Sequence, residues 1–326
     1  MMLTVVIPSY KRPRELANCL AGIDAQERQP DEVIVVCREE DAGTLEFVEQ
    51  WEAAPAGYIK RHVRVTKPGV IHAMQTGVEQ TSGDIVAFID DDAVPWKDWA
   101  GRLLDYYRDP QVGGVGGRDM IAGRDHTVKK PVVGRVTWYG KLIGNHDQGY
   151  GGPREVDVLK GVNMSFRTPL VKFPEFMKGK GAQVHFEVFL CLRIRRLGYK
   201  LIYDPELRVD HYPATRHDID QRNAIVRDAV ANASFNLSVA LLHGLPAYRR
   251  PARIAYGVLV GDRRMPGVAR VLYGAAKGDR AVMQTFLPSM KGQLEGVLFY
   301  LRHTDADTQA DAPSRQQLPL KEGQRT

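Results

Sequence analysis

The first 110 residues alternate short, continuous apolar runs with segments of helical periodicity. The apolar runs are rich in Val and Ile and too short for helices, so they predict strands that are buried on both faces. They lie at residues 3–7, 32–36, 62–65 and 85–89. The helical patterns lie between and after them, at residues 14–23, 43–51, 70–80 and 96–107. This alternation predicts an α/β fold, with a Rossmann-like, mostly parallel sheet flanked by helices.

The pattern is less regular after residue 110. Residues 113–154 are rich in glycine, and the glycine runs at 113–117 and 149–152 flank a loop-like stretch that contains Trp138 and Tyr139. A helical pattern at 186–197 stops at Gly198, and two short strands are predicted at 200–203 and 207–209, with a turn between them. From residue 220 the pattern is again helical, and one apolar stripe recurs at helical spacing. Its members are Phe286, Met290, Leu294, Val297 and Leu301.

The strand at 85–89 ends in three consecutive carboxylates, Asp90, Asp91 and Asp92. Like charges this close repel one another unless a cation lies between them. A divalent metal that holds a substrate diphosphate is a suitable cation, because Mg²⁺ and Mn²⁺ favour oxygen ligands. The alternative is a solvated acidic turn that caps the following helix.

Composition narrows the class of protein only slightly. The net charge of +6 suits anionic partners such as nucleotide diphosphates, acidic lipid surfaces or nucleic acid, but no nucleic-acid-binding motif is present, so nucleic acid is not expected as a partner. The three cysteines have no metal-binding spacing, which favours a reduced, cytoplasmic protein. Nothing at the start resembles a signal peptide, and no apolar run approaches the roughly 20 residues that cross a bilayer. We therefore expect a chain that does not span a membrane.

The first turn contains no glycine, which separates this chain from two enzyme classes. A dinucleotide-binding fingerprint needs glycines between the first strand and the first helix, and Pro8-Ser9-Tyr10-Lys11-Arg12 stands there instead. A Rossmann dehydrogenase is therefore not expected. The same turn counts against a sugar-phosphate nucleotidyltransferase, whose class generally begins with a glycine-rich phosphate loop.

Four segments, in order, resemble the inverting nucleotide-sugar glycosyltransferases of family 2, which have the GT-A fold. They are residues 5–10, residues 83–92 with a DxD metal motif, residues 160–167, and a segment from Glu187 to His211. The resemblance covers residues 1–212 and implies a nucleotide-binding half (1–110) and an acceptor-side half (111–212). A helical extension (213–303) and a polar, disordered tail (304–326) would follow.

The resemblance also implies roles for individual residues. Glu187 would be the catalytic carboxylate, and Asp92 and His211 would bind Mg²⁺ or Mn²⁺. The nucleotide-sugar would contact Pro8, Tyr10, Arg12, Arg38, Asp90, Asp91 and Asn163. The register of the three aspartates, and hence which two face the metal and the ribose, stays open.

The chain departs from the family pattern at two places. Cys37-Arg38 stands where the family has an Asp-Asp-Gly-Ser turn that helps to read the base, and Glu187 has no acidic neighbour. Taken without the resemblance, Glu187 could merely favour a helix dipole, His211 could be structural, and Asn163 could form an Asx turn.

The helical extension combines apolar stripes with many arginines, a combination that binds anionic membrane surfaces. An ordinary helical subdomain or a dimer interface is the alternative, and the oligomeric state is not predicted. The expected function is metal-dependent, inverting transfer of a sugar from a nucleotide-sugar to a hydroxyl of a glycan or lipid-linked acceptor, in cell-surface glycan or glycolipid synthesis. The expected location is cytoplasmic, or peripheral on the cytoplasmic face of the membrane. A non-catalytic glycan-binding or assembly subunit of the same fold is the non-enzymatic alternative.

Overall fold

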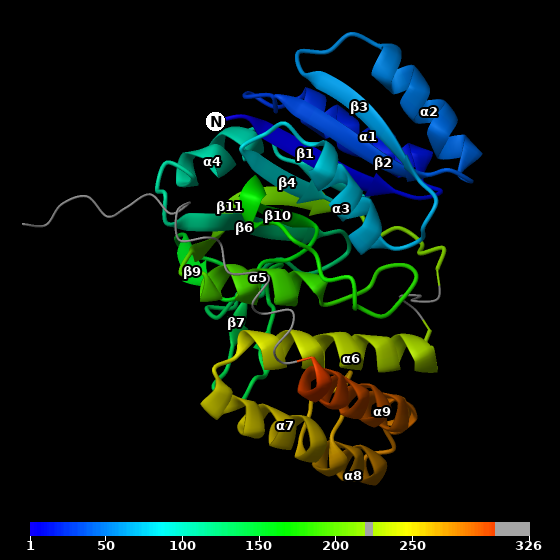
Figure 1. Ribbon diagram of the computed structural model, residues 1–326, viewed down its shortest axis with the longest axis vertical. Helices are drawn as coiled ribbons and strands as arrows, with labels where there is room; N and C mark the ends of the chain where they lie inside the picture. Colours follow the sequence, from blue (N-terminus) through cyan, green and yellow to red (C-terminus); the bar gives the residue numbers. More distant parts are fainter. Residues whose placement is uncertain (219–223, 304–326) are drawn as a thin grey trace, which may run out of the picture.

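A mixed sheet forms the centre of the computed structural model, which describes residues 1–218 and 224–303 (Figure 1). Its strands lie in the order β3-β2-β1-β4-β10-β6-β11-β5, and β9 pairs with β11 beside this path. The bounds are β1 (Leu3–Ser9), β2 (Glu32–Arg38), β3 (Ile59–Val65), β4 (Ile85–Ile89), β5 (Ala93–Pro95), β6 (Val112–Ile121), β9 (Arg154–Val156), β10 (Asn163–Arg167) and β11 (Lys200–His211). Strands β1 to β4 are parallel, whereas β10 and β5 are antiparallel to their neighbours. This largely parallel sheet confirms the predicted fold class.

Helices cover both faces of the sheet because successive strand residues point to opposite sides. Val6, Val86 and Phe88 belong to one hydrophobic core, whereas Val5 and Ala87 belong to the other. The first core is closed by α3 (Val70–Gln80) and α5 (Phe186–Arg196), and the second by α1 (Pro13–Asp24), α2 (Ala42–Ala53) and α4 (Trp99–Tyr106). Both faces are buried, which is why the strand sequences read as nearly continuous Val and Ile.

The first glycine-rich run lies in a strand, which was not predicted from the sequence. It lies in β6, between β10 and β11, and its glycines allow neighbouring chains to approach closely. A Cβ atom on Gly117 would lie 1.7 Å from the carbonyl oxygen of Leu207, and one on Gly114 would lie 2.7 Å from the ring of Phe166. Two small strands, β7 (Arg135–Val136) and β8 (Leu142–Ile143), pair within the following segment.

The two strands predicted at 200–203 and 207–209 are one strand, β11. The predicted turn at Asp204-Pro205 is a shift in its register against β6, between Asp204 and Arg208. This correction matters for the site, because an unbroken β11 carries its last residue, His211, to the same edge of the sheet as the end of β4.

A stack of helices follows the sheet (Figure 1). It consists of α6 (Arg227–Gly244), α7 (Arg250–Leu259), α8 (Val268–Ala276) and α9 (Arg280–Arg302). A short 3₁₀ turn, Ala247–Arg249, lies between α6 and α7, and another, Thr168–Leu170, follows β10. Helix α6 packs against α5 on one side and α9 on the other. Within the described residues, none of the helices is long and apolar enough to cross a membrane. The predicted tail, 304–326, lies outside the described residues.

The apolar stripe predicted in α9 is not the face that packs on α6. The packed face is made of small residues, since a Cβ atom on Gly292 would lie 2.1 Å from the carbonyl oxygen of Ala231. Two members of the stripe, Leu294 and Leu301, are 61% and 62% exposed, and the other three are half-buried. The periodicity therefore identified the helix correctly but not its buried side.

Candidate metal and nucleotide site

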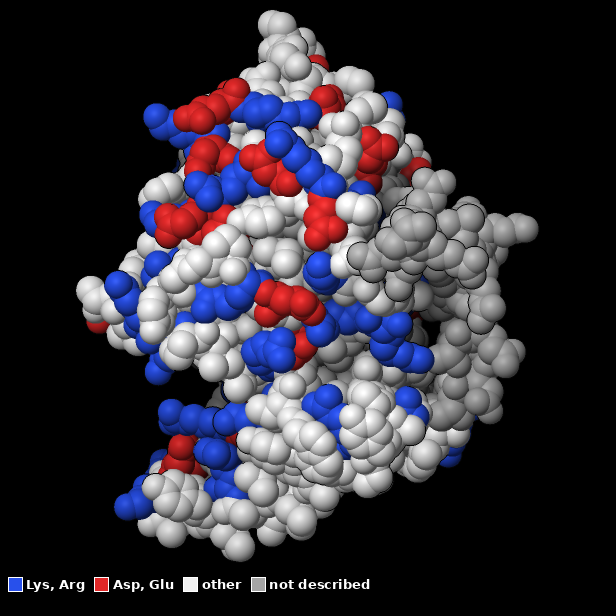
Figure 2. Space-filling view, turned by 90° about the vertical axis from the view of Figure 1, so that its left-hand side faces the viewer, with Lys and Arg blue, Asp and Glu red and all other residues white. Residues whose placement is uncertain are grey.

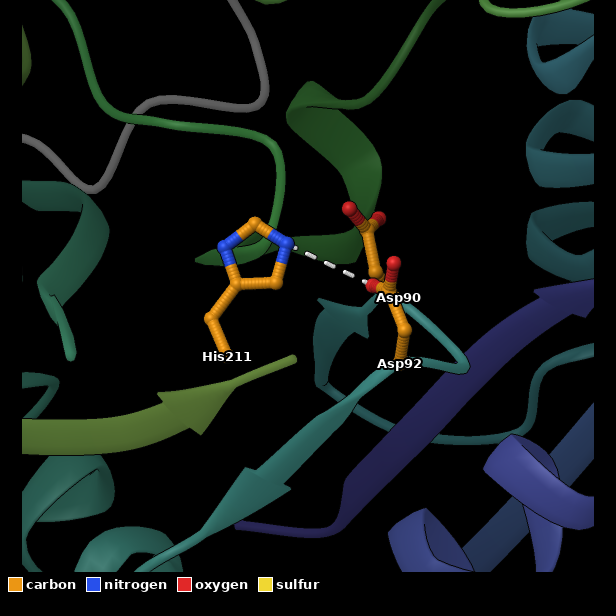
Figure 3. Close-up of side chains that lie close together, drawn as sticks. All are labelled: Asp90, Asp92 and His211. Atoms are coloured by element: carbon orange, nitrogen blue, oxygen red, sulfur yellow. Dashed lines mark ion pairs between the residues drawn. The ribbon is translucent and has the colours of Figure 1, made fainter. Parts of the chain in front are cut away.

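Asp90, Asp92 and His211 meet at the edge of the sheet where β4 and β11 end (Figure 3). Antiparallel pairing of β5 with β11 places Ala93 opposite His211. Asp92, the residue before Ala93, therefore lies beside the imidazole of His211. The backbone N–H of Tyr212 donates to the carbonyl oxygen of Asp92 at 2.8 Å and locks this corner. One ligand atom from each of the three side chains lies within 4.8 Å of the others, so the group could hold a metal ion.

Asp92 is buried and charged. One carboxylate oxygen accepts a hydrogen bond from the backbone N–H of Ala214 at 2.8 Å, and the other lies 3.5 Å from Nε2 of His211. Burial opposes ionisation, but the contacts with His211 and Ala214 outweigh it and lower the pKa of Asp92 to about 2. An ionised carboxylate is the form that a divalent metal binds.

Asp91 is held by the turn after β1 and by Arg12, which also lies 3.7 Å from a carboxylate oxygen of Asp92. Its carboxylate accepts from the hydroxyl of Ser9 at 2.8 Å and from Arg12 at 2.7 Å. Burial raises the pKa of Asp91 to about 7, against the effect of Arg12. Burial and the charge of Asp92 also raise the pKa of Asp90. The structure thus brings Asp90 and Asp92 together with His211, and it ties Asp91 to the turn after β1.

His211 lies between two carboxylates, those of Asp92 and Asp119. Its Nδ1 atom is 3.5 Å from Asp119, which is fully buried in β6 and also forms an ion pair with Lys160. Burial lowers the pKa of His211, but the two carboxylates outweigh burial and raise it to about 9. Asp119 was not predicted from the sequence. In the sequence, Asp119 is a single carboxylate after a run of Gly and Val. Its nearness to His211 could be predicted only if that run were known to form a strand beside β11.

Glu187 lies in the first turn of α5, which begins after His185 in a left-handed conformation with φ of 75°. Burial raises the pKa of Glu187 to about 7, opposed by the charge of Lys160 and reinforced by that of Asp90. A carboxylate with this pKa changes protonation near neutral pH, as a general base must.

The residues expected around the nucleotide form a second group, beside the turn after β1. Arg38 at the end of β2 stacks on the ring of Tyr10 at 4.4 Å, and Pro8 pairs with Val36 in the sheet. Arg12 also donates to the carbonyl oxygen of Thr215 at 2.9 Å, so the segment after β11 lies against this turn.

Asn163 lies in the interior, and its side chain has structural partners. Its carbonyl oxygen accepts from the indole of Trp99 at 2.9 Å, and its amide donates to the carbonyl of Leu207 at 2.9 Å. Trp138, by contrast, is 61% exposed, and the ring of Tyr139 packs 4.9 Å from that of Tyr256.

Comparisons with known proteins identify the family. The family model "Glycosyltransferase like family 2" matches residues 2–225, so the chain belongs to this family and is a glycosyltransferase. It is similar to a glucosyl-dolichyl phosphate glucuronosyltransferase of Haloferax volcanii, with 30% identity over 226 residues, which cover 65% of this chain and 69% of that protein. It is also similar to glycosyltransferase AglE of the same organism, with 31% identity over 117 residues, which cover 35% of this chain and 38% of that protein.

Two solved structures share the fold. A mannosyltransferase from Pyrobaculum calidifontis, in complex with GDP-Man and Mn²⁺, has a TM-score of 0.53 and 19% identity, covering 90% of this chain and 86% of that one. TarS 1–349 from S. aureus, in complex with UDP-GlcNAc, has a TM-score of 0.58 and 14% identity, covering 94% of this chain and 89% of that one. At these identities the likeness shows the GT-A fold alone.

Proposed function

We propose that the protein is a metal-dependent, inverting glycosyltransferase that moves a sugar from a nucleotide-sugar to a hydroxyl of a glycan or lipid-linked acceptor. The observation that carries the proposal is the cluster of Asp90, Asp92 and His211 at the strand ends. A glutamate with a pKa of about 7 lies close enough for the charge of Asp90 to affect it.

Asp92 and His211 are the proposed metal ligands, and Asp90 is proposed to face the ribose or the water shell of the metal. Two carboxylates and an imidazole suit Mn²⁺ or Mg²⁺, with Mn²⁺ more tolerant of the nitrogen ligand. The ion, when bound, would neutralise charge on the departing diphosphate. Because the pKa of His211 is raised to about 9, its imidazole is in the cationic form at neutral pH. Metal binding must therefore displace one of its two ring protons.

Arg12 and Tyr10 are proposed to contact the nucleotide, as are Pro8 and Arg38. Arg12 forms an ion pair with Asp91 at 2.7 Å, which would orient the three consecutive aspartates. The remaining N–H groups of its guanidinium could then donate to a phosphate. The stacked pair of Arg38 and Tyr10 would supply a flat surface for the nucleotide beside the turn.

Glu187 is the proposed base. It would take the proton of the acceptor hydroxyl while that oxygen attacks the anomeric carbon from the side opposite the diphosphate, in a single displacement that inverts the configuration. Positioned general bases typically contribute ~10²–10⁴-fold in rate. Lys160 affects the pKa of Glu187 and forms an ion pair with Asp119, so it connects the base to the His211 side of the site.

The helices after the sheet are proposed to dock on an anionic membrane surface, on the cytoplasmic face. Residues 246–303 contain ten Lys and Arg but three Asp and Glu, a net +7 in a chain whose total is +6. Figure 2 shows the same contrast, with acidic side chains gathered over the upper, sheet-containing part and scarce on the lower part. Large apolar side chains stand exposed on the same helices, among them Leu259, Leu272, Tyr273, Leu287, Leu294 and Leu301. Exposed apolar groups among basic ones are the composition of an interfacial membrane surface, which would place the enzyme beside a lipid-linked acceptor for cell-surface glycan or glycolipid synthesis.

A thermal-shift panel of nucleoside diphosphates and nucleotide-sugars, with and without Mn²⁺, tests the proposed function. The proposal predicts that one nucleotide raises the melting temperature only when Mn²⁺ is present, because a ligand that binds the folded state stabilises it. Asp92→Ala must abolish the shift, whereas Asp98→Ala, at an exposed surface pair, must keep it. If every nucleotide changed the melting temperature by the same amount with and without Mn²⁺, the proposed metal dependence would be wrong.

A further inference from the structure

Arg253, on α7, is a buried cation without a hydrogen-bond or ion-pair partner among the described residues. It is 6% exposed, and its guanidinium makes no hydrogen bond or ion pair with any residue in 1–218 or 224–303. Its aliphatic part packs on Gly140, because a Cβ atom added there would lie 2.4 Å from Cδ of Arg253. A buried charge without a partner is strongly destabilising, so such a group is kept where a ligand completes it.

The carboxylate of Asp262 acts on Arg253 through its charge but not by contact. The charge of Asp262 reaches Arg253, but the two form no ion pair within 4.0 Å. One oxygen of Asp262 instead accepts from the backbone N–H groups of Arg264 and Met265, at 2.8 and 2.9 Å. Asp262 therefore shapes the loop between α7 and α8. Arg264 is exposed on this loop, and its charge, like that of Arg253, acts on His185.

His185 links this charge to the site. It immediately precedes α5, two residues before Glu187, and its Nδ1 atom is buried without a hydrogen-bond partner. Burial lowers the pKa of His185 to about 4, and the charges of Arg253 and Arg264 contribute in the same direction. The imidazole is therefore neutral and can donate one N–H to an anion.

Two arginines and a neutral histidine beside a helix N-terminus suit a phosphate group. A planar guanidinium fork matches phosphate oxygens in a bidentate manner, and helix N-termini favour negative charge. We propose that Arg253, with His185 and Arg264, binds a phosphate of the acceptor and so holds its hydroxyl near Glu187. The proposal rests on the proposed function only in calling this phosphate part of the acceptor.

Phosphate binding can be measured without donor, metal or turnover. The full chain is melted in EDTA with farnesyl phosphate, glucose 1-phosphate or farnesol, and apparent affinities are taken from the concentration dependence of the shift. We expect a shift with farnesyl phosphate and none with farnesol. Arg253→Met must weaken phosphate binding roughly 10- to 100-fold, the effect of losing a hydrogen bond to a charged group. Arg263→Met, at an exposed arginine paired with Asp279, must bind as the unmodified protein does.

The possible results separate a ligand site from a structural role. A shift with both phosphate esters supports recognition of the phosphate alone, and a shift with farnesyl phosphate only supports a lipid-borne phosphate. Arg253→Lys keeps the charge, so it must fold and bind with intermediate affinity even if Arg253→Met does not fold. Unchanged phosphate affinity in Arg253→Met or Arg253→Lys, or no shift with either ester in the unmodified protein, overturns the proposal. Because transfer activity is not measured, failure of the proposed function would leave these results unaffected.

Discussion

Asp92 and His211 lie 3.5 Å apart, although one follows β4 and the other ends β11. Pairing of β5 with β11 brings them together, and Ala214 holds the second oxygen of Asp92 in place. A buried carboxylate and a buried imidazole at this distance form a preorganised pair, and the pair lies at the carboxyl end of β4, where open α/β sheets bind their ligands.

Asp119 is expected to raise the metal affinity of the site through its contact with His211. Metal-binding histidines commonly use their second nitrogen to contact a carboxylate, and loss of that carboxylate costs about 10- to 100-fold in metal affinity. Asp119→Asn should therefore weaken Mn²⁺ binding by this factor in a calorimetric titration. Asp98→Asn, at the surface, is the matched control. Equal Mn²⁺ affinity in Asp119→Asn and the unmodified protein would show that Asp119 serves the fold alone.

Transfer is expected to depend on pH through Glu187. A base must be deprotonated, and burial raises the pKa of Glu187 to about 7, so the active fraction grows as the pH rises from 6 to 8. The rate constant kcat should rise over this interval and level off above it. Glu187→Gln should lower kcat by ~10²–10⁴-fold while leaving donor binding intact. Full turnover by Glu187→Gln would make the base assignment wrong, even in a working transferase.

The exposed leucines of α8 and α9 are expected to carry membrane binding. Leu272→Gln combined with Leu287→Gln removes two side chains that are 67% and 64% exposed, so it should cost little stability. The double variant should float with anionic liposomes much less than the unmodified chain. Ile59→Gln, an exposed residue on β3, is the control for general loss of apolar surface. If the unmodified chain does not float with anionic liposomes at all, the proposed docking is wrong.

Much of the first half of the fold could be predicted from sequence because its strands are apolar on both faces and its helices are periodic. Strand β6 could not, since glycine has little intrinsic preference for strands, and only the close approach of Leu207 and Phe166 explains its use there. The side of α9 that faces solvent could not be predicted either. Periodicity identifies a helix, but α9 packs on α6 through small residues such as Gly292.

The site was predicted unevenly for a similar reason. The nearness of Asp90, Asp92 and His211 could be predicted because motif order located the strand ends at which they lie. Asp91 could not be separated from its neighbours, because its contact with Arg12 depends on the geometry of the turn. Arg253 gave no signal among the other arginines of the extension, because only burial distinguishes it.

Gly117 gives a test of the unusual strand. An alanine there would place Cβ 1.7 Å from the carbonyl oxygen of Leu207, so β11 must shift. We expect Gly117→Ala to lower the free energy of unfolding by about 1–3 kcal/mol, as overpacking does, in urea denaturation. Gly152→Ala, where the added Cβ meets no atom within 4 Å, should change it little. Equal stability of the two variants would mean that β6 and β11 do not approach as described.

The central claim is that a divalent metal binds between the ends of β4 and β11 and holds the donor diphosphate there. The most direct test is an anomalous difference map from a crystal soaked with Mn²⁺ and the nucleoside diphosphate that gives the largest metal-dependent thermal shift. We predict one peak within bonding distance of Asp92 and His211, contacted by diphosphate oxygens. Diphosphate bound without a peak at that position, with Asp92 still held by Ala214 and His211, would contradict the claim.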